Sequence, residues 1–175
     1  KALELIETHE YFGVSPAQIE AIIHPESLIH ALVGFTDGAL MAHIGPPDMR
    51  HAIGFALNWP DRRHVPVERL DLAAVGQLTF TAPDTDRYPA LRLARDVMEM
   101  GGLSGAVFNG SKERALDAFI DGRIGFLDMA RVVEATLTKL SSDSHMSAEI
   151  TLENVLESDR QARAVADGAI ATLRG

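Results

Sequence analysis

The residues from His24 to Arg50, HPESLIHALVGFTDGALMAHIGPPDMR, contain the strongest structural signal in the chain. Two apolar runs, Leu28–Phe35 and Ala39–Ile44, lie on either side of a short turn that contains an Asp-Gly pair. Asp-Gly between apolar runs is typical of a hairpin because glycine accepts the positive φ that tight turns require. A proline-rich breaker follows, after which Asp48 could cap a helix over Met49–Leu57. The stretch therefore predicts a β-hairpin that leads into a helix.

The residues before the hairpin mix helical and extended patterns. Lys1–Phe12 predicts an amphipathic helix, and Gly13 is placed to end it. Ser15–Gln18 is typical of a turn or a short helical start, while the apolar run Ile19–Ile23 predicts a strand. The first 58 residues are thus expected to combine helices with a small sheet.

The rest of the chain divides into a connector and a helical region. Residues 59–84 carry scattered prolines and charges but also leucines, so this connector is expected to pack against protein. In residues 85–175, apolar side chains recur at helical spacing in four segments: Tyr88–Met98, Ala106–Ile120, Met129–Leu140 and Leu152–Leu173. Ser141–Ser144 breaks the third from the fourth. We predict an α+β fold that ends in an all-α four-helix bundle.

Composition restricts the classes of function. The formal net charge of -9 disfavours nucleic-acid binding, which relies on clustered Lys and Arg. No apolar run approaches the roughly 20 residues of a membrane span, so the cytoplasm is the expected location. The chain has no cysteine, so a metal would be held by carboxylates, histidines or carbonyl oxygens. Such ligands favour hard cations such as Mg²⁺ or Mn²⁺.

Lys1 and Glu4 form the first candidate site because residues three apart share one face of a helix. An ammonium and a carboxylate that project together could bind a phosphate and a metal in one pocket. An ion pair on the surface of an amphipathic helix explains the same spacing and is much more common. Spacing alone therefore favours the structural interpretation.

The histidines near the hairpin give a weaker signal. His24, His30, His43 and His51 lie close together in the sequence, but their spacing does not match a helical metal-binding motif such as H-E-x-x-H. Hydrogen-bonded structural histidines beside a sheet are the favoured interpretation. The chain also contains no glycine-rich nucleotide fingerprint and no G-x-S-x-G element.

Several ordered motifs go further than these patterns, because together they resemble one enzyme family. The stretch HPESLIHALVGFTDGALMAHIGPPDMRHAIGFALNWP strongly resembles the 1-deoxy-D-xylulose 5-phosphate reductoisomerases of non-mevalonate isoprenoid biosynthesis. KALELIE at the start is similar to the family's N-K-x-L-E-x-I-E helix without its asparagine. LDLAAVGQLTFTAPDTDRYPALRLA, GRIGFLDMARVVEATL and LENVLESDRQARAVA resemble the later segments in the same order. The resemblance covers essentially the whole chain.

The resemblance implies an oxidoreductase that converts 1-deoxy-D-xylulose 5-phosphate to 2-C-methyl-D-erythritol 4-phosphate with NADPH and Mg²⁺ or Mn²⁺. Members have an N-terminal NADPH domain, a central catalytic and dimerisation domain, a connector and a C-terminal bundle, and act as homodimers. Residues 1–58 would then end the catalytic domain, residues 59–84 form the connector and residues 85–175 the bundle. NADPH would be bound mainly by the absent N-terminal domain, and this part alone would be inactive.

The family also implies roles for individual residues. The lysine and glutamate of its K-x-x-E helix bind substrate, and the glutamate is one of three acidic metal ligands; they match Lys1 and Glu4. Ser27, His30 and Met49 match motif positions close to the substrate and cofactor site. Where the family usually reads N-A-A-N-E, residues 109–113 read NGSKE, which puts local packing in doubt rather than metal chemistry.

Two other hypotheses stay open at this point. The chain could be a non-catalytic dimerisation or interaction module derived from the enzyme, which would self-associate and bind neither NADPH nor metal. It could also belong to a reductoisomerase-like enzyme that acts on another phosphorylated sugar, for which the altered residues 109–113 are the hint.

Overall fold

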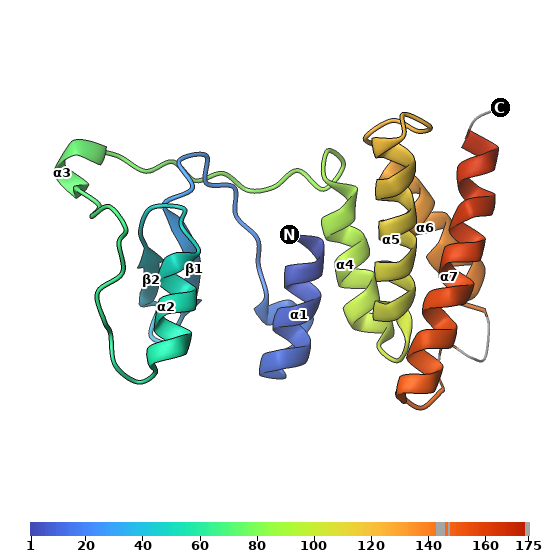
Figure 1. The fold of residues 1–175 in the computed structure, drawn as a ribbon, viewed down its shortest axis with the longest axis horizontal. Coiled ribbons are helices and arrows are strands. Elements are labelled where there is room, and N and C mark those ends of the chain that lie inside the picture. Colours follow the sequence, from blue (N-terminus) through green and yellow to red (C-terminus); the bar gives the residue numbers. More distant parts are fainter. Residues whose placement is uncertain (143–145, 147, 174–175) are drawn as a thin grey trace. The chain divides into compact units, whose positions relative to one another are not determined.

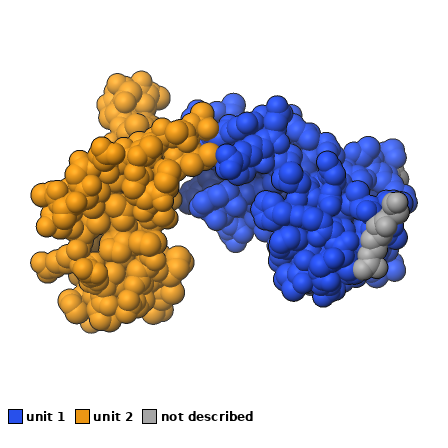
Figure 2. All heavy atoms as spheres, turned by 90° about the horizontal axis from the view of Figure 1, so that it is seen from above, with its two compact units in different colours: residues 1–21, 83–175 blue, residues 22–82 orange. Residues whose placement is uncertain are grey.

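The computed structural model describes residues 1–142, 146 and 148–173. The chain divides into two compact units (Figure 2): residues 1–21 together with 83–175 form unit 1, and residues 22–82 form unit 2. Unit 1 thus combines two separate stretches of the chain, whereas unit 2 is one continuous stretch. The predicted boundaries near residues 58 and 84 concern the domains of a complete enzyme and stay a prediction.

Unit 1 is helical (Figure 1). Its elements are α1 (Ala2–Phe12), the 3-10 turn η1 (Pro16–Gln18), α4 (Pro89–Met100), α5 (Ser104–Ile120), α6 (Asp128–Leu140) and α7 (Leu152–Leu173). The four helices predicted for the bundle are confirmed as α4 to α7. The helix predicted to begin at Ala106 begins at Ser104. Of the predicted break after α6, Asp143 and Ser144 lie outside the described residues.

The bundle core forms where the apolar faces of these helices meet, with α5 packed against both α6 and α7. One cluster joins α4 to the first half of α5 and to α6 through buried residues that include Val97, Phe108 and Val133. A second cluster joins the last part of α5 to α7 and includes Ala118 and Ile170. Burial of each large apolar side chain contributes roughly 1.5–3 kcal/mol, so these clusters stabilise the bundle.

Helix α1 belongs to the same unit as the bundle, although the sequence placed it with the hairpin. Leu5 and Ile6 are buried in the cluster that contains Leu93 and Val97 of α4. Gly13 ends α1 in the left-handed conformation, with φ of 63°, as its sequence position predicted. The helix that carries Lys1 and Glu4 is therefore supported by the bundle.

Unit 2 contains the predicted hairpin. Strands β1 (Ile29–Gly34) and β2 (Leu40–Ile44) pair antiparallel, with Val33 opposite Met41. At the turn Gly38 has a φ of 88°, which is the reason for the Asp-Gly pair. The unit also contains α2 (Arg50–Asn58) and the short α3 (Leu72–Val75) within the connector.

Two local predictions need correction. The predicted strand Ile19–Ile23 is wrong, because only Ile23 pairs, in an isolated bridge with Thr81, while Ile19 is buried in the core of unit 1. Tertiary packing of Ile19 overrides the local β preference. The helix predicted from Met49 begins at Arg50, and Met49 occupies the cap position. Asp48 still accepts a hydrogen bond from the Arg50 backbone N–H, at 2.9 Å.

The two units differ in how well they bury apolar side chains. All residues of 22–82 are described, and none of their hydrophobic side chains is among the buried core. Val33, Met41, Leu57 and Trp59 are all more than half exposed. Exposed apolar side chains that gather in one patch are typical of surfaces that another protein segment covers. Within the part of the chain that the structure describes, no helix has the length and apolar character needed to cross a membrane.

Candidate functional site

The predicted pair Lys1 and Glu4 is formed at the start of α1. The Lys1 Nζ atom donates to Glu4 Oε2 at 2.5 Å. Both side chains are largely exposed, at 70% and 58%. The carboxylate also lies in the first turn of the helix, where the helix dipole favours a negative charge. The pair is thus held together and is open to a ligand.

The electrostatics of this pair favour the ionised carboxylate. The hydrogen bond from Lys1 lowers the pKa of Glu4 below its ordinary value. An ionised, exposed carboxylate fits the oxygen ligand that Mg²⁺ or Mn²⁺ prefers. Glu4 supplies only one such ligand, and in the described ranges no group of three or more His, Asp or Glu side chains could hold a metal ion. Further ligands would have to come from other residues.

Ser27 occupies a strained position in the turn before β1. Its φ of 53° makes it the one non-glycine residue with positive φ among the described residues. Its backbone N–H donates to the His24 carbonyl at 3.1 Å, which closes the turn. A non-glycine residue in this region costs about 1–3 kcal/mol and is found preferentially at functional sites. The backbone strain at Ser27 is therefore compatible with a place in a functional site, but it identifies no ligand for this residue.

His30 has a well-defined structural partner. Its Nε2 atom lies 3.0 Å from the Gly45 carbonyl oxygen, across the two strands of the hairpin. The ring also lies beside His43, with centroids 5.6 Å apart. The hydrogen bond holds the proline-rich segment that follows β2 against β1. His30 is therefore a hydrogen-bonded histidine beside the sheet, as the structural interpretation predicted, and a role beside the substrate stays a prediction.

Met49 is 70% exposed immediately before α2. The loop beneath it is fixed by its neighbours, since Arg50 donates from Nε to Asp48 Oδ1 at 2.9 Å and pairs with Oδ2 as well. The Arg50 side-chain hydrogen bond lowers the pKa of Asp48 to about 2. The Asp48–Arg50 pair thus presents the thioether of Met49 outward from a stiff segment.

Sequence reasoning missed the surroundings of His24. Its imidazole stacks on Phe80 with centroids 4.8 Å apart, and its Nδ1 atom lies 2.9 Å from the Thr79 carbonyl oxygen and 3.0 Å from Glu26 Oε2. A hydrogen bond from the Thr79 side chain lowers the pKa of Glu26. No spacing could reveal this cluster, because residues 79 and 80 are more than fifty positions from His24.

Unit 2 also contains an open hollow of about 430 Å³ between the end of β2 and the connector. Its polar lining comes from His51, His64, Glu68 and Arg69. The Nε2 atom of His51 is buried and has no hydrogen-bond partner among the described residues. None of the five predicted site residues lines this hollow. Lys1 and Glu4 lie in unit 1, whereas Ser27, His30 and Met49 lie in unit 2.

The altered segment Asn109–Glu113 lies where α5 meets α7, not at either candidate site. A Cβ at Gly110 would lie 2.8 Å from Asp159 Oδ1 and 3.1 Å from its carbonyl oxygen, so glycine permits a close helix approach. Ser111 is buried and donates to the Val107 carbonyl at 2.8 Å. The segment is therefore adapted to packing within the bundle.

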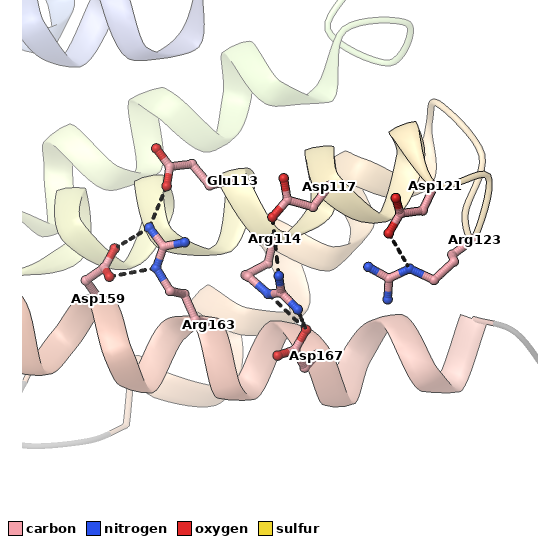
Figure 3. Close-up of polar contacts among 8 residues, drawn as sticks. All are labelled: Glu113, Arg114, Asp117, Asp121, Arg123, Asp159, Arg163 and Asp167. Carbon is pink, nitrogen blue, oxygen red and sulfur yellow. Dashed lines mark hydrogen bonds and ion pairs between the residues drawn. The ribbon is translucent and has the colours of Figure 1, made fainter.

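Ion pairs connect the same two helices (Figure 3). Arg163 of α7 pairs with Asp159 on its own helix and with Glu113 of α5. Arg114 of α5 pairs with Asp167 of α7 at 2.6 Å. These ion pairs have a structural role, because they join α5 to α7 within the bundle.

Comparisons with known proteins test the family directly. The family model for the DXP reductoisomerase C-terminal domain matches residues 44–165. The 1-deoxy-D-xylulose 5-phosphate reductoisomerase of Ruegeria pomeroyi is 65% identical over 100% of this chain and 45% of its own length. That of Jannaschia sp. is 63% identical over 98% of this chain and 44% of its own length.

The chain belongs to the DXP reductoisomerase family. It spans less than half the length of the curated relatives it matches. The resemblance seen in its motifs is thus confirmed, and so is the α+β fold with a helical C-terminal part.

Solved DXP reductoisomerases share this fold. The enzyme from Zymomonas mobilis in complex with NADPH is 41% identical, with a TM-score of 0.89 over 97% of this chain and 44% of its own. A DOX-P reductoisomerase in complex with magnesium gives 35% identity and a TM-score of 0.94 over 99% and 45% of the two chains. A third, with NADPH, fosmidomycin and magnesium, gives 36% identity and a TM-score of 0.91 over 99% and 44%.

Proposed function

We propose that this chain supplies the C-terminal half of a DXP reductoisomerase that converts 1-deoxy-D-xylulose 5-phosphate to 2-C-methyl-D-erythritol 4-phosphate. The observation that carries the proposal is the 65% identity to such an enzyme over the whole chain. The cofactors are NADPH and a divalent metal, Mg²⁺ or Mn²⁺. Relatives in complex with NADPH, with magnesium and with fosmidomycin support this assignment. The enzyme acts in the cytoplasm.

In this proposal Glu4 is one of several ligands of the metal, and Lys1 binds the phosphorylated sugar. Bound metal would polarise the carbonyl and hydroxyl oxygens of the substrate. Glu4 is an exposed carboxylate whose pKa is lowered by its hydrogen bond with Lys1, and the exposed ammonium of Lys1 offers charge-assisted hydrogen bonds. Ser27, His30 and Met49 lie beside the substrate and cofactor. NADPH is held mainly by residues outside this chain.

The test is Glu4→Gln in the complete enzyme that contains these residues. The amide keeps the shape of the side chain but is a poor metal ligand, so metal-dependent turnover is expected to fall by at least about a hundredfold. Glu10→Gln is the matched control, because Glu10 is an exposed carboxylate on the same helix and lies outside the family motif that ends at Glu7. Equal turnover in the two variants would remove Glu4 from the metal site.

A dimerisation role is a second function that one observation favours. Unit 2 leaves Val33, Met41 and Leu57 more than half exposed. We propose that a second copy or the remainder of the enzyme covers this surface, and that the complete enzyme is a homodimer. If the chain is instead an interaction module alone, it will self-associate without binding NADPH or metal in titration calorimetry.

The hypothesis that the enzyme acts on a different phosphorylated sugar has its own test. Turnover of a panel of phosphorylated sugars by the complete enzyme is compared with turnover of 1-deoxy-D-xylulose 5-phosphate.

A further inference from the structure

Helix α1 carries Lys1 and Glu4, and the segment that follows it is held by a polar contact from α4 of the bundle. Arg95 lies on α4, and its guanidinium donates from Nη1 to the Pro16 carbonyl and from Nη2 to the Ile19 carbonyl, both at 3.2 Å. Within the part of the chain that the structure describes, Arg95 forms no ion pair with an acidic side chain, unlike Arg92 on the same helix. The guanidinium is thus used to hold backbone carbonyls.

Those carbonyls belong to the segment that follows α1. His9, in the last turn of α1, places its Nδ1 atom 2.7 Å from the Val14 carbonyl oxygen. The Gly13 backbone N–H donates to the His9 carbonyl at 2.9 Å. Residues 13–19 are therefore bonded to α1 at one end and to Arg95 at the other.

The other contact between α1 and the bundle is apolar. Leu5 and Ile6 are buried with Leu93 and Val97 of α4. Apolar packing is non-directional, so it holds the helix against α4 but restricts its tilt and rotation less than directed hydrogen bonds do. Arg95 supplies the directed restraint at the far end of α1.

We propose that Arg95 is a positioning residue for the Lys1 and Glu4 site, and that α4 is the part of the bundle through which it acts. This proposal rests on the proposed function. A helix of 11 residues is about 16 Å long, so a tilt of a few degrees displaces its first turn by on the order of 1 Å. A misplacement of that size can cost up to about a hundredfold in rate.

The experiment compares Arg95→Met with Arg92→Met in the complete enzyme. Arg92 is exposed on the same helix and pairs with Asp96 and Glu134, not with the segment after α1. For Arg95→Met, kcat is expected to fall about tenfold and the Mg²⁺ concentration for half-maximal rate to rise severalfold, with the KM for NADPH unchanged. Arg95→Lys is expected to restore part of the loss, because one ammonium can reach one carbonyl.

A second measurement separates this proposal from the proposed function. Hydrogen exchange of the backbone amides of residues 5–19 is expected to be faster in Arg95→Met and unchanged in Arg92→Met. If the enzyme has no reductoisomerase activity at all, the proposed function fails and the exchange still tests the restraint. Equal Mg²⁺ dependence and equal exchange in the two variants would overturn the proposal. If Arg95→Met does not fold, the same comparison with Arg95→Lys decides it.

Discussion

Arg163 of α7 donates from Nη2 to the Glu113 carboxylate of α5 at 2.5 Å. The same guanidinium pairs with Asp159 one turn earlier on α7, at 2.7 Å. Both carboxylates raise the pKa of Arg163, and the largest cause is the hydrogen bond that Arg163 donates to Asp159. The arginine therefore stays charged and joins two helices whose backbones approach closely at Gly110.

Arg163→Met is expected to lower the free energy of unfolding by about 1 kcal/mol, because it removes a cation from between two carboxylates that then repel each other. The matched control is Arg160→Met, whose arginine pairs with Glu157 within α7 and is 76% exposed. That change should cost no more than about 0.5 kcal/mol. Urea denaturation of both variants measures the difference, which should shrink at high salt. Equal losses would mean that the contact between helices adds no stability.

Ile6→Ala is expected to destabilise unit 1 by about 2–4 kcal/mol, because Ile6 is only 8% exposed in the core cluster and truncation leaves a cavity. Tyr11→Ala on the same helix is the control, since Tyr11 is 83% exposed. Its cost should stay within about 0.5 kcal/mol. Thermal unfolding followed by circular dichroism measures both. A small loss for Ile6→Ala would show that α1 is not held by the bundle core.

Acid is expected to weaken the start of α2 through Asp48. The folded-state pKa of Asp48 is lowered to about 2 by its hydrogen bonds with Arg50, so the carboxylate favours folding when it is ionised. The contribution is present above the ordinary value near 4 and is lost as the pH falls through about 2. Trp59, the single tryptophan, directly follows α2 and reports this change by fluorescence. Asp48→Asn should remove the transition between about pH 4 and 2, and a transition that persists would assign it to another carboxylate.

Local sequence patterns predicted most elements of this fold because each carries its own signal. The Asp-Gly turn, the glycine that ends α1 and the helical spacing of α4 to α7 depend on residues close in sequence. The packing of α1 on α4 and the burial of Ile19 do not, since their partners lie more than seventy positions away. Such contacts explain why Ile19–Ile23 is not a strand: Ile19 is buried in the core of unit 1, and only Ile23 forms a bridge, with Thr81.

The candidate site divides in the same manner. The spacing of Lys1 and Glu4 predicted that they would meet, and the hydrogen bond confirms it. Spacing could not distinguish a ligand-binding pair from a surface pair, because both look alike on a helix. The resemblance to a family favours the ligand-binding role, which stays a prediction. The restraint by Arg95 carries no local signal at all, since it donates to backbone carbonyls of any sequence.

The exposed hairpin leads to a prediction about association. Val33 and Met41 are directly paired across β1 and β2 and are 56% and 65% exposed. Lysine is disfavoured in apolar contacts between sheets and chains, so the double change Val33→Lys with Met41→Lys is expected to suppress self-association of the chain. The measurement is the molar mass by light scattering after size-exclusion chromatography. The molar mass of the unchanged chain should rise with protein concentration, whereas that of the variant should not.

The control for the hairpin variant adds two lysines to α1 instead of to the hairpin. Tyr11→Lys with Phe12→Lys alters two exposed apolar side chains of α1, at 83% and 77% exposure, and adds two charges as the hairpin variant does. If this variant loses association equally, net charge rather than the hairpin surface controls it. In the complete enzyme we expect the hairpin variant to lower the dimer fraction as well, because we propose that a second copy covers this exposed apolar surface.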